Sequence, residues 1–178
     1  KKVVLIDDFP VAVKPICDLM PRLRDYLQDC EPLRNKLFQI EFLATDSGEL
    51  MLCLIYHRAL DEEWTAQAKV LAERFGAQVI GRSRKQKIVL GRDWLLERIE
   101  LDGRTLHYQQ IEGSFTQPNF GVNRHMLGWA CRQVADAGGD LLELYCGNGN
   151  FTIALAPAFE QVLATEVSKS SVAAAHYH

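Results

Sequence analysis

The segment that most restricts how this chain can fold is LLELYCGNGNFTIALA, residues 141 to 156. It runs from a short apolar strand, through a turn with Gly147 and Gly149, into a segment with a helical pattern. Glycine lets the backbone turn sharply and lets its amides approach a ligand. Ligands of open α/β sheets bind beyond the carboxyl ends of the strands, where this turn lies. The segment therefore predicts a parallel α/β sheet with a candidate ligand loop, although a tight turn that binds nothing has the same glycines.

The next predicted strand, QVLATE, ends in a carboxylate, Glu166. Neighbouring parallel strands end at the same edge, so Glu166 is expected near the loop, where a carboxylate can accept hydrogen bonds from a ribose diol. An ordinary surface acid is the alternative. The dinucleotide-binding fingerprint has a third glycine where this chain has Thr152. Asn148 and Asn150 also suit an amino-acid group better than a pyrophosphate, so the residues favour S-adenosylmethionine over NAD.

The residue pattern of the chain changes near residue 117. Residues 1–111 alternate helical segments with β-prone runs, which predicts an α+β domain of mainly antiparallel pairing. Residues 112–178 follow the order helix, strand, glycine loop, helix, strand and helix start, which is the beginning of a Rossmann-like α/β sheet. Such sheets have roughly five to seven strands, so we expect the chain to be a fragment of a longer enzyme.

The charge balance alone argues against bulk affinity for a polyanion, because 20 basic residues face 23 acidic ones, a net charge of −3. Nucleic-acid binding depends on local patches rather than on net charge. One patch is RSRKQK, which has no acid and four cations: Arg82, Arg84, Lys85 and Lys87. These are candidate RNA contacts, and a solvated hairpin is the alternative.

The five cysteines are an odd number and none lies in a CxxC pair. This spacing favours reduced thiols over disulfides, a zinc site or an iron–sulfur cluster, so no metal is expected. The sequence has neither an apolar run of transmembrane length nor a leader pattern, so the protein is expected to be cytoplasmic without a membrane partner.

Several separated segments resemble the RNA uracil-5 methyltransferases: SFTQPN, LLELYCGNGNF and VLATEVSKSSVAAA, with KLFQIEF and LIYHRALDEEW similar to the branch that modifies tRNA. The resemblance covers nearly the whole chain. It implies the start of a Rossmann-like S-adenosylmethionine-dependent methyltransferase sheet, preceded by an α+β RNA-contacting domain. The implied activity is methylation of carbon 5 of a uridine in the tRNA T-loop. Alternatives are an enzyme of ribosomal RNA, an NAD-linked oxidoreductase and a stand-alone RNA-binding fragment.

The resemblance also implies roles for individual residues. Gln117, Tyr145, Asn150 and Glu166 match the family's S-adenosylmethionine contacts, and Gly147 belongs to the turn of the same loop.

For RNA, the implied partner is the T-arm of tRNA, and other RNAs with a T-loop-like fold. Phe38 matches a segment of the family's RNA-facing domain and is a candidate to stack a base, although an apolar residue in a β run is equally a core residue. His57 and Arg58 are candidate phosphate contacts beside the basic patch.

The family's reaction uses a cysteine that adds to carbon 6 of the uracil and a base that removes the proton from carbon 5. The resemblance implies that both lie beyond residue 178, so no catalytic residue is expected in this chain. Cys146 is the alternative nucleophile. It belongs to the first turn of the loop and has no histidine or lysine neighbour in sequence to lower its pKa, so we reject it.

Overall fold

The computed structural model describes residue 6 and residues 9–177, and it contains two compact units, Lys1–Asp93 and Trp94–His178. This division comes earlier than the boundary predicted at residue 111. The reason is that strand β5 (Trp94–Leu101) pairs with β6 (Arg104–Ile111) and packs against helix α4 (Phe120–Gln133) of the second unit. Among the described residues, no helix has the length and apolar character needed to cross a bilayer.

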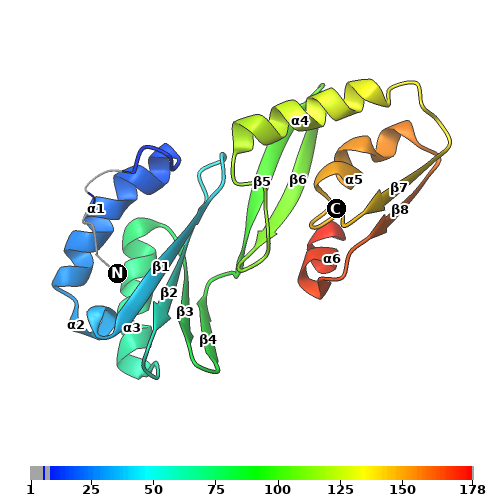
Figure 1. Ribbon diagram of the computed structural model, residues 1–178. Coiled ribbons are helices and arrows are strands. Elements are labelled where there is room, and N and C mark those ends of the chain that lie inside the picture. The colour runs from blue at the N-terminus through cyan, green and yellow to red at the C-terminus, as the bar shows by residue number, and fades with distance from the viewer. Residues whose placement is uncertain (1–5, 7–8, 178) are drawn as a thin grey trace. The chain divides into compact units, whose positions relative to one another are not determined.

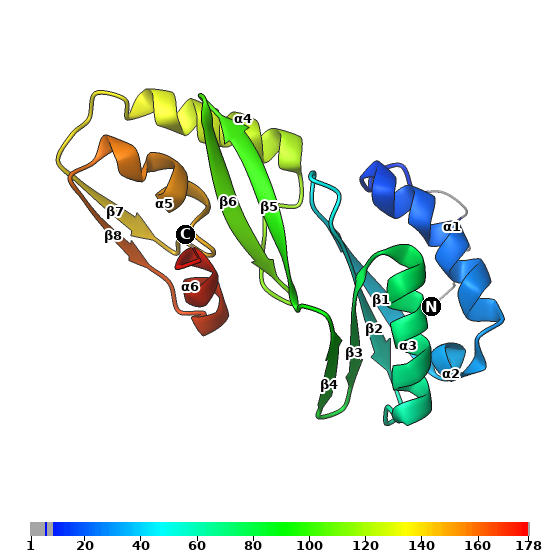
Figure 2. The same ribbon diagram turned by 180° about the vertical axis from the view of Figure 1, so that it is seen from behind.

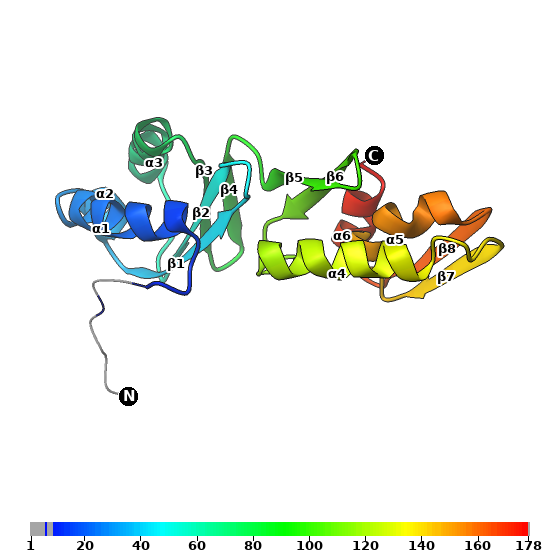
Figure 3. The same ribbon diagram turned by 90° about the horizontal axis from the view of Figure 1, so that it is seen from above.

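The first unit is a four-stranded sheet in the order β1 (Leu37–Ala44), β2 (Leu50–Tyr56), β3 (Gln78–Ser83) and β4 (Gln86–Leu90). The β1–β2 and β3–β4 pairs are antiparallel, and the β2–β3 pair is parallel. Helices α1 (Lys14–Gln28), α2 (Glu31–Arg34) and α3 (Glu62–Phe75) cover one face of the sheet (Figures 1 and 3). The predicted mixed, mainly antiparallel α+β arrangement is confirmed.

Helix α3 connects the two parallel strands and is defined at both ends by its sequence. The Asp61 carboxylate accepts a hydrogen bond of 2.8 Å from the backbone N–H of Trp64, which caps the amino terminus. Gly76 ends the helix in the left-handed conformation, with φ of 62°. These caps place the Trp64 indole, which is fully buried, against Gly81 of β3.

The second unit begins with the β5–β6 hairpin, and α4 crosses the hairpin and packs against β5 (Figure 2). Asn119 caps α4, because its side-chain oxygen accepts a hydrogen bond of 3.0 Å from the N–H of Val122. The chain then follows the predicted order: β7 (Asp140–Leu144), α5 (Asn150–Leu155), the short helix η1 (Ala156–Ala158), β8 (Gln161–Thr165) and α6 (Lys169–Ala175). Strands β7 and β8 are parallel, which confirms the start of a Rossmann-like sheet.

One face of the β7–β8 pair is apolar and exposed. Leu142, Leu144 and Leu163 are 61%, 60% and 64% exposed. Parallel sheets normally bury both faces under helices, so this pair has the composition of a sheet interior.

The contact between Trp64 and Gly81 gives a stability prediction. A β-carbon at residue 81 would lie 2.2 Å from the Trp64 ring, and the core around it is closely packed. We expect Gly81→Ala to lower the free energy of unfolding by about 1–3 kcal/mol, measured by denaturant titration. Gly121→Ala is the control, because only Asn119 Oδ1 at 3.7 Å would lie near its β-carbon in an exposed helix. Equal stability of the two variants would contradict the described packing.

Candidate functional site

The glycine loop between β7 and α5 has an unusual backbone. Tyr145, Gly147 and Gly149 have φ values of 58°, 58° and 82°, all in the left-handed region. This conformation is costly for a residue with a β-carbon, so the rest of the fold has to offset the backbone strain at Tyr145. The backbone N–H of Cys146 donates to Thr165 O at 3.0 Å, which fixes the loop to the neighbouring strand. The Tyr145 ring is 85% exposed and is therefore presented to solvent at the carboxyl edge of the sheet.

Glu166 connects the two strand ends through its carboxylate. Oε2 accepts a hydrogen bond of 3.0 Å from Gly147 N, and Oε1 accepts bonds of 2.7 Å from Val167 N and 2.8 Å from Ser168 N. The hydrogen bonds from Ser168 N and then Gly147 N hold the pKa of this carboxyl below its usual value, so it is ionised at neutral pH. An ionised carboxylate has about four acceptor positions, so one remains for a ligand hydroxyl.

The asparagines of the loop bind the protein itself. Asn150 and Asn123 of α4 form a reciprocal amide pair, in which each Nδ2 donates to the other's Oδ1 at 2.9 Å. Tyr108 of β6 donates its hydroxyl proton to Asn150 O at 3.0 Å, and Asn148 Nδ2 donates to Gln109 O at 3.3 Å. The sequence interpretation aimed these amides at a ligand, whereas the structure uses their nitrogens to fix the loop to the hairpin and to α4.

Next to the loop, the Glu143 side chain is partly buried and the Cys146 thiol is buried. The Thr152 hydroxyl donates to the Glu143 carboxylate, and burial raises the pKa of Glu143. Cys146 is 8% exposed. Burial, followed by the nearby carboxylates of Glu143 and Glu166, raises the pKa of its thiol. A protonated thiol is a poor nucleophile, which agrees with the structural role inferred for Cys146.

The predicted cofactor residues lie in three places. Gly147 and Glu166 are joined by their hydrogen bond, and Tyr145 precedes them at the end of β7. Asn150 begins α5. Gln117 is partly buried in the segment between β6 and α4, next to the Asn119 cap. A β-carbon on Gly147 would meet no atom within 4 Å, so this side of the loop is open.

Sequence reasoning missed three residues that shape the loop: Asn123, Tyr108 and Glu143. The sequence does contain an indication of the role of Asn123, because this polar residue falls on the same face of the predicted helix as Leu127 and Ala130, which are buried in α4. A polar side chain at such a position needs a partner. Which partner it has depends on the packing of α4 against α5.

In the first unit, Phe38 lies on the surface rather than in the core. Its side chain is 62% exposed. Its ring stacks on the His57 imidazole, with 4.3 Å between the ring centroids and 18° between the planes. The pair offers a flat aromatic surface of the kind on which unstacked bases lie.

A surface hollow of 410 Å³ is lined by His57 of this pair, and Arg84 of the turn between β3 and β4 contributes to its wall. Arg84 and Lys85 are exposed at that turn, while Gln86 bonds the backbone of Leu60. The hollow is lined by Tyr56, His57, Arg58, Ala59, Ser83, Arg84 and Gln86. His57 of the aromatic pair and Arg84 of the basic turn therefore line the same hollow.

The other predicted cations are engaged within the protein. Arg58 donates to the backbone oxygens of Pro32, Asn35 and Ala59 and pairs with the Asp61 carboxylate, so its role is structural. Lys87 forms an ion pair of 2.7 Å with Asp93, and Arg82 is partly buried in β3.

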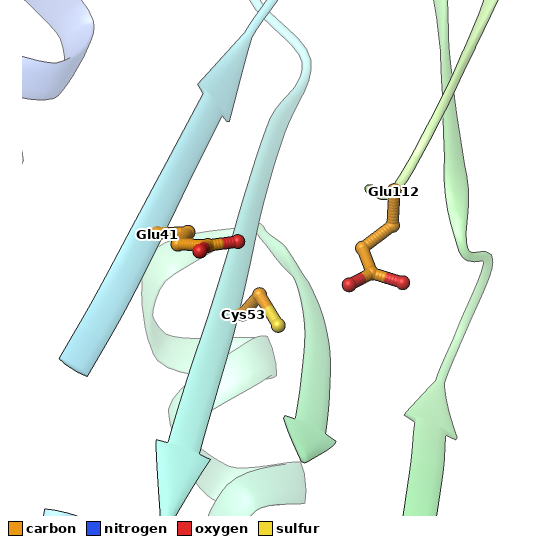
Figure 4. Close-up of side chains that lie close together, drawn as sticks. All are labelled: Glu41, Cys53 and Glu112. Atoms are coloured by element: carbon orange, nitrogen blue, oxygen red, sulfur yellow. The ribbon is translucent and has the colours of Figure 1, made fainter. Parts of the chain in front are cut away.

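A possible metal ligand pair lies on β1 and β2. Glu41 is exposed and Cys53 is buried, and they are register partners in the sheet (Figure 4). Glu112, also drawn there, belongs to the second unit. Two ligands of one unit are fewer than the three or four protein ligands typical of zinc centres, so the pair does not by itself define a metal site.

The strand, glycine loop, helix and strand-end acid together define the beginning of a Rossmann-like methyltransferase fold. A sequence profile described as tRNA (uracil-5-)-methyltransferase matches residues 1–178, and the chain belongs to that family.

Curated relatives agree with this assignment. The tRNA/tmRNA (uracil-C(5))-methyltransferase of Aromatoleum aromaticum is 68% identical over the whole chain, and that of Dechloromonas aromatica is 65% identical. The chain covers 48% and 49% of these proteins, so it spans about half the length of the curated relatives it matches.

A solved structure shows the same fold. The Pyrococcus abyssi tRNA (uracil-54, C5)-methyltransferase, in complex with S-adenosyl-L-homocysteine, matches with a TM-score of 0.72 at 17% identity. The match covers 98% of this chain and 46% of that one.

The buried thiol gives a prediction for chemical labelling. Because burial raises the pKa of Cys146, we expect iodoacetamide at neutral pH to alkylate it more slowly than the partly exposed Cys17. The Cys146 rate should rise as the pH rises towards that pKa. Peptide mass spectrometry of the native protein measures both rates, and equal rates at neutral pH would contradict the shielding of Cys146.

Proposed function

We propose that the full-length protein transfers a methyl group from S-adenosylmethionine to carbon 5 of a uridine in the T-loop of tRNA, giving 5-methyluridine. Two observations carry this proposal: the family profile matches the whole chain, and the Gly147 N–H donates to the Glu166 carboxylate at the end of the next strand. We call this hydrogen-bonded pair the cradle. The names of the curated relatives favour tRNA over ribosomal RNA. T-loop specificity follows from the resemblance to the tRNA branch of the family.

The residues fit an S-adenosyl group on three observations. Glu166 is ionised and keeps an acceptor position for a ribose hydroxyl. The open side of Gly147 allows close approach of a ligand. The exposed Tyr145 ring is available to contact the adenine of the S-adenosyl group. Gln117 and Asn150 complete the proposed contact set, Asn150 through the second Nδ2 proton that its pair with Asn123 leaves over. Thr152, whose hydroxyl bonds Glu143, replaces the third glycine of NAD sites.

The acceptor carbon determines what the rest of the protein must provide. Carbon 5 of uracil is a weak nucleophile, so we propose that a cysteine thiolate outside this segment adds to carbon 6 and makes carbon 5 enolate-like. The cofactor supplies a methyl group on a positively charged sulfur. After transfer, a base removes the proton from carbon 5 and the thiolate leaves. Within this chain, the residues bind and orient, and Cys146 is not the nucleophile.

For the RNA, we propose that Phe38 stacks on an exposed base of the opened T-loop and that Arg84 and Lys85 contact phosphates. The exposed Phe38–His57 stack and the hollow shared with Arg84 support this assignment. Arg82 and Lys87 are secondary candidates, because Arg82 is partly buried and Lys87 already has an acidic partner. Other RNAs with a T-loop-like fold would offer the same base and phosphates.

The cofactor assignment is tested by calorimetry. We expect the full-length protein to bind S-adenosylhomocysteine and not NADH. Glu166→Ala should weaken S-adenosylhomocysteine about tenfold or more, because it removes a charged acceptor and frees the loop. Glu160→Ala removes an exposed acid before β8 and should leave affinity unchanged. Undiminished affinity in Glu166→Ala would refute the cradle, and preferential NADH binding would refute the methyltransferase assignment.

The RNA assignment is tested through salt dependence. Replacing Arg84 and Lys85 by alanine should weaken tRNA binding and reduce the slope of log affinity against log salt by about one to two. Fluorescence anisotropy with labelled tRNA at several salt concentrations measures the slope. Lys69→Ala, which removes an exposed charge on α3, is the control. If the double variant keeps the wild-type slope, the turn does not contact RNA.

A further inference from the structure

We infer that Asn123 of α4 is a positioning residue for the cofactor loop, acting through its reciprocal amide pair with Asn150. This inference rests on the proposed function, because it assigns Asn123 a role in cofactor binding. Asn123 lies in α4, whereas the loop leads into α5. Asn123 belongs to none of the sequence motifs that predicted the site.

Each side chain contributes one Nδ2 donor and its Oδ1 acceptor to the pair. Asn123 Nδ2 donates to Asn150 Oδ1, and Asn150 Nδ2 donates to Asn123 Oδ1, each at 2.9 Å. Asn123 is 6% exposed. A buried amide without partners is costly, so loss of one member leaves the other in an unfavourable environment. The two side chains therefore hold each other in one orientation.

The position of Asn150 makes this pairing relevant to the loop. Asn150 follows Gly149, whose left-handed conformation turns the chain into α5. Tyr108 holds the Asn150 backbone oxygen from β6, and Asn123 holds its side chain from α4. Glycines make the loop adaptable but also increase its conformational entropy in the absence of such anchors. The anchors on Asn150 fix one end of the loop, while Glu166 fixes Gly147 at the other.

Ordering the loop before the ligand arrives should increase affinity, because the loop then loses less conformational entropy when the ligand binds. Asn123 touches no ligand in this account. Its effect should appear in cofactor affinity and in loop order, and much less in the affinity for tRNA.

The experiment compares three replacements at Asn123 in the full-length protein. Asn123→Ala and the similarly sized Asn123→Leu should each weaken S-adenosylhomocysteine about tenfold. Asn123→Asp should be pH-dependent. The neutral acid can both donate to Asn150 Oδ1 and accept from Asn150 Nδ2, whereas the carboxylate cannot donate. Burial should raise the pKa of the introduced acid, so its affinity relative to wild type should recover as the pH falls from about 8 to about 6.

Two further measurements separate positioning from general stability and from failure of the proposed function. Thermal unfolding shows whether each variant is folded. As a binding control, Arg124→Ala changes an exposed residue next to Asn123 and should bind S-adenosylhomocysteine like wild type. Nuclear magnetic resonance of the ligand-free protein should show slowly exchanging side-chain amide protons of Asn150 in wild type and fast exchange in Asn123→Leu.

The inference is overturned if folded Asn123→Leu binds like wild type and Asn123→Asp shows no pH dependence. If wild type binds no S-adenosylhomocysteine, the proposed function fails instead. The Asn150 amide exchange then still decides whether Asn123 orders the loop, and unchanged exchange in Asn123→Leu overturns that role.

Discussion

The site depends on one carboxylate that accepts hydrogen bonds from the backbone of two strand ends. Glu166 follows β8, and its acceptance of the Gly147 N–H ties that strand to the loop after β7. The parallel pairing of β7 and β8 brings the two groups to the same edge of the sheet. The interaction also explains the lowered pKa of Glu166, because backbone N–H groups stabilise the ionised form. In the proposed function, the remaining acceptor position of this charged group is assigned to a ribose hydroxyl.

The sequence predicted those features that depend on local chemistry. The glycine loop, the strand-end acid and the order of elements after residue 112 follow from patterns of a few residues. The sequence analysis placed residues 94–111 in the first domain, whereas the structure groups β5 and β6 with the second unit, and β5 is hard to recognise because Glu97 occupies one of its buried positions. The Asn123–Asn150 pair joins residues far apart in the chain, and only tertiary packing brings them together. The same holds for Tyr108, whose hydroxyl reaches the loop from the hairpin.

The two units divide the proposed work according to their surfaces. The first unit presents an exposed aromatic pair and a basic turn, and His57 and Arg84 from these two features line one hollow, which suits a splayed nucleotide and its phosphates. The positive charge of this turn is a local feature of the surface, because the net charge of the whole chain is −3. The second unit presents an ordered loop that is fixed from three directions: by the neighbouring strand, by the hairpin and by α4. The chemistry of the methyl acceptor is proposed to come from elsewhere in the full-length protein.

The central claim is that protein hydrogen bonds order the glycine loop before any cofactor binds. Backbone amide hydrogen exchange in the ligand-free full-length protein tests it most directly. The account predicts that Gly147 N–H exchanges much more slowly than the N–H of Gly113, which lies in an exposed turn. Replacement of Glu166 by alanine should remove that protection. Exchange of Gly147 as fast as that of Gly113 in the wild-type protein would contradict the account.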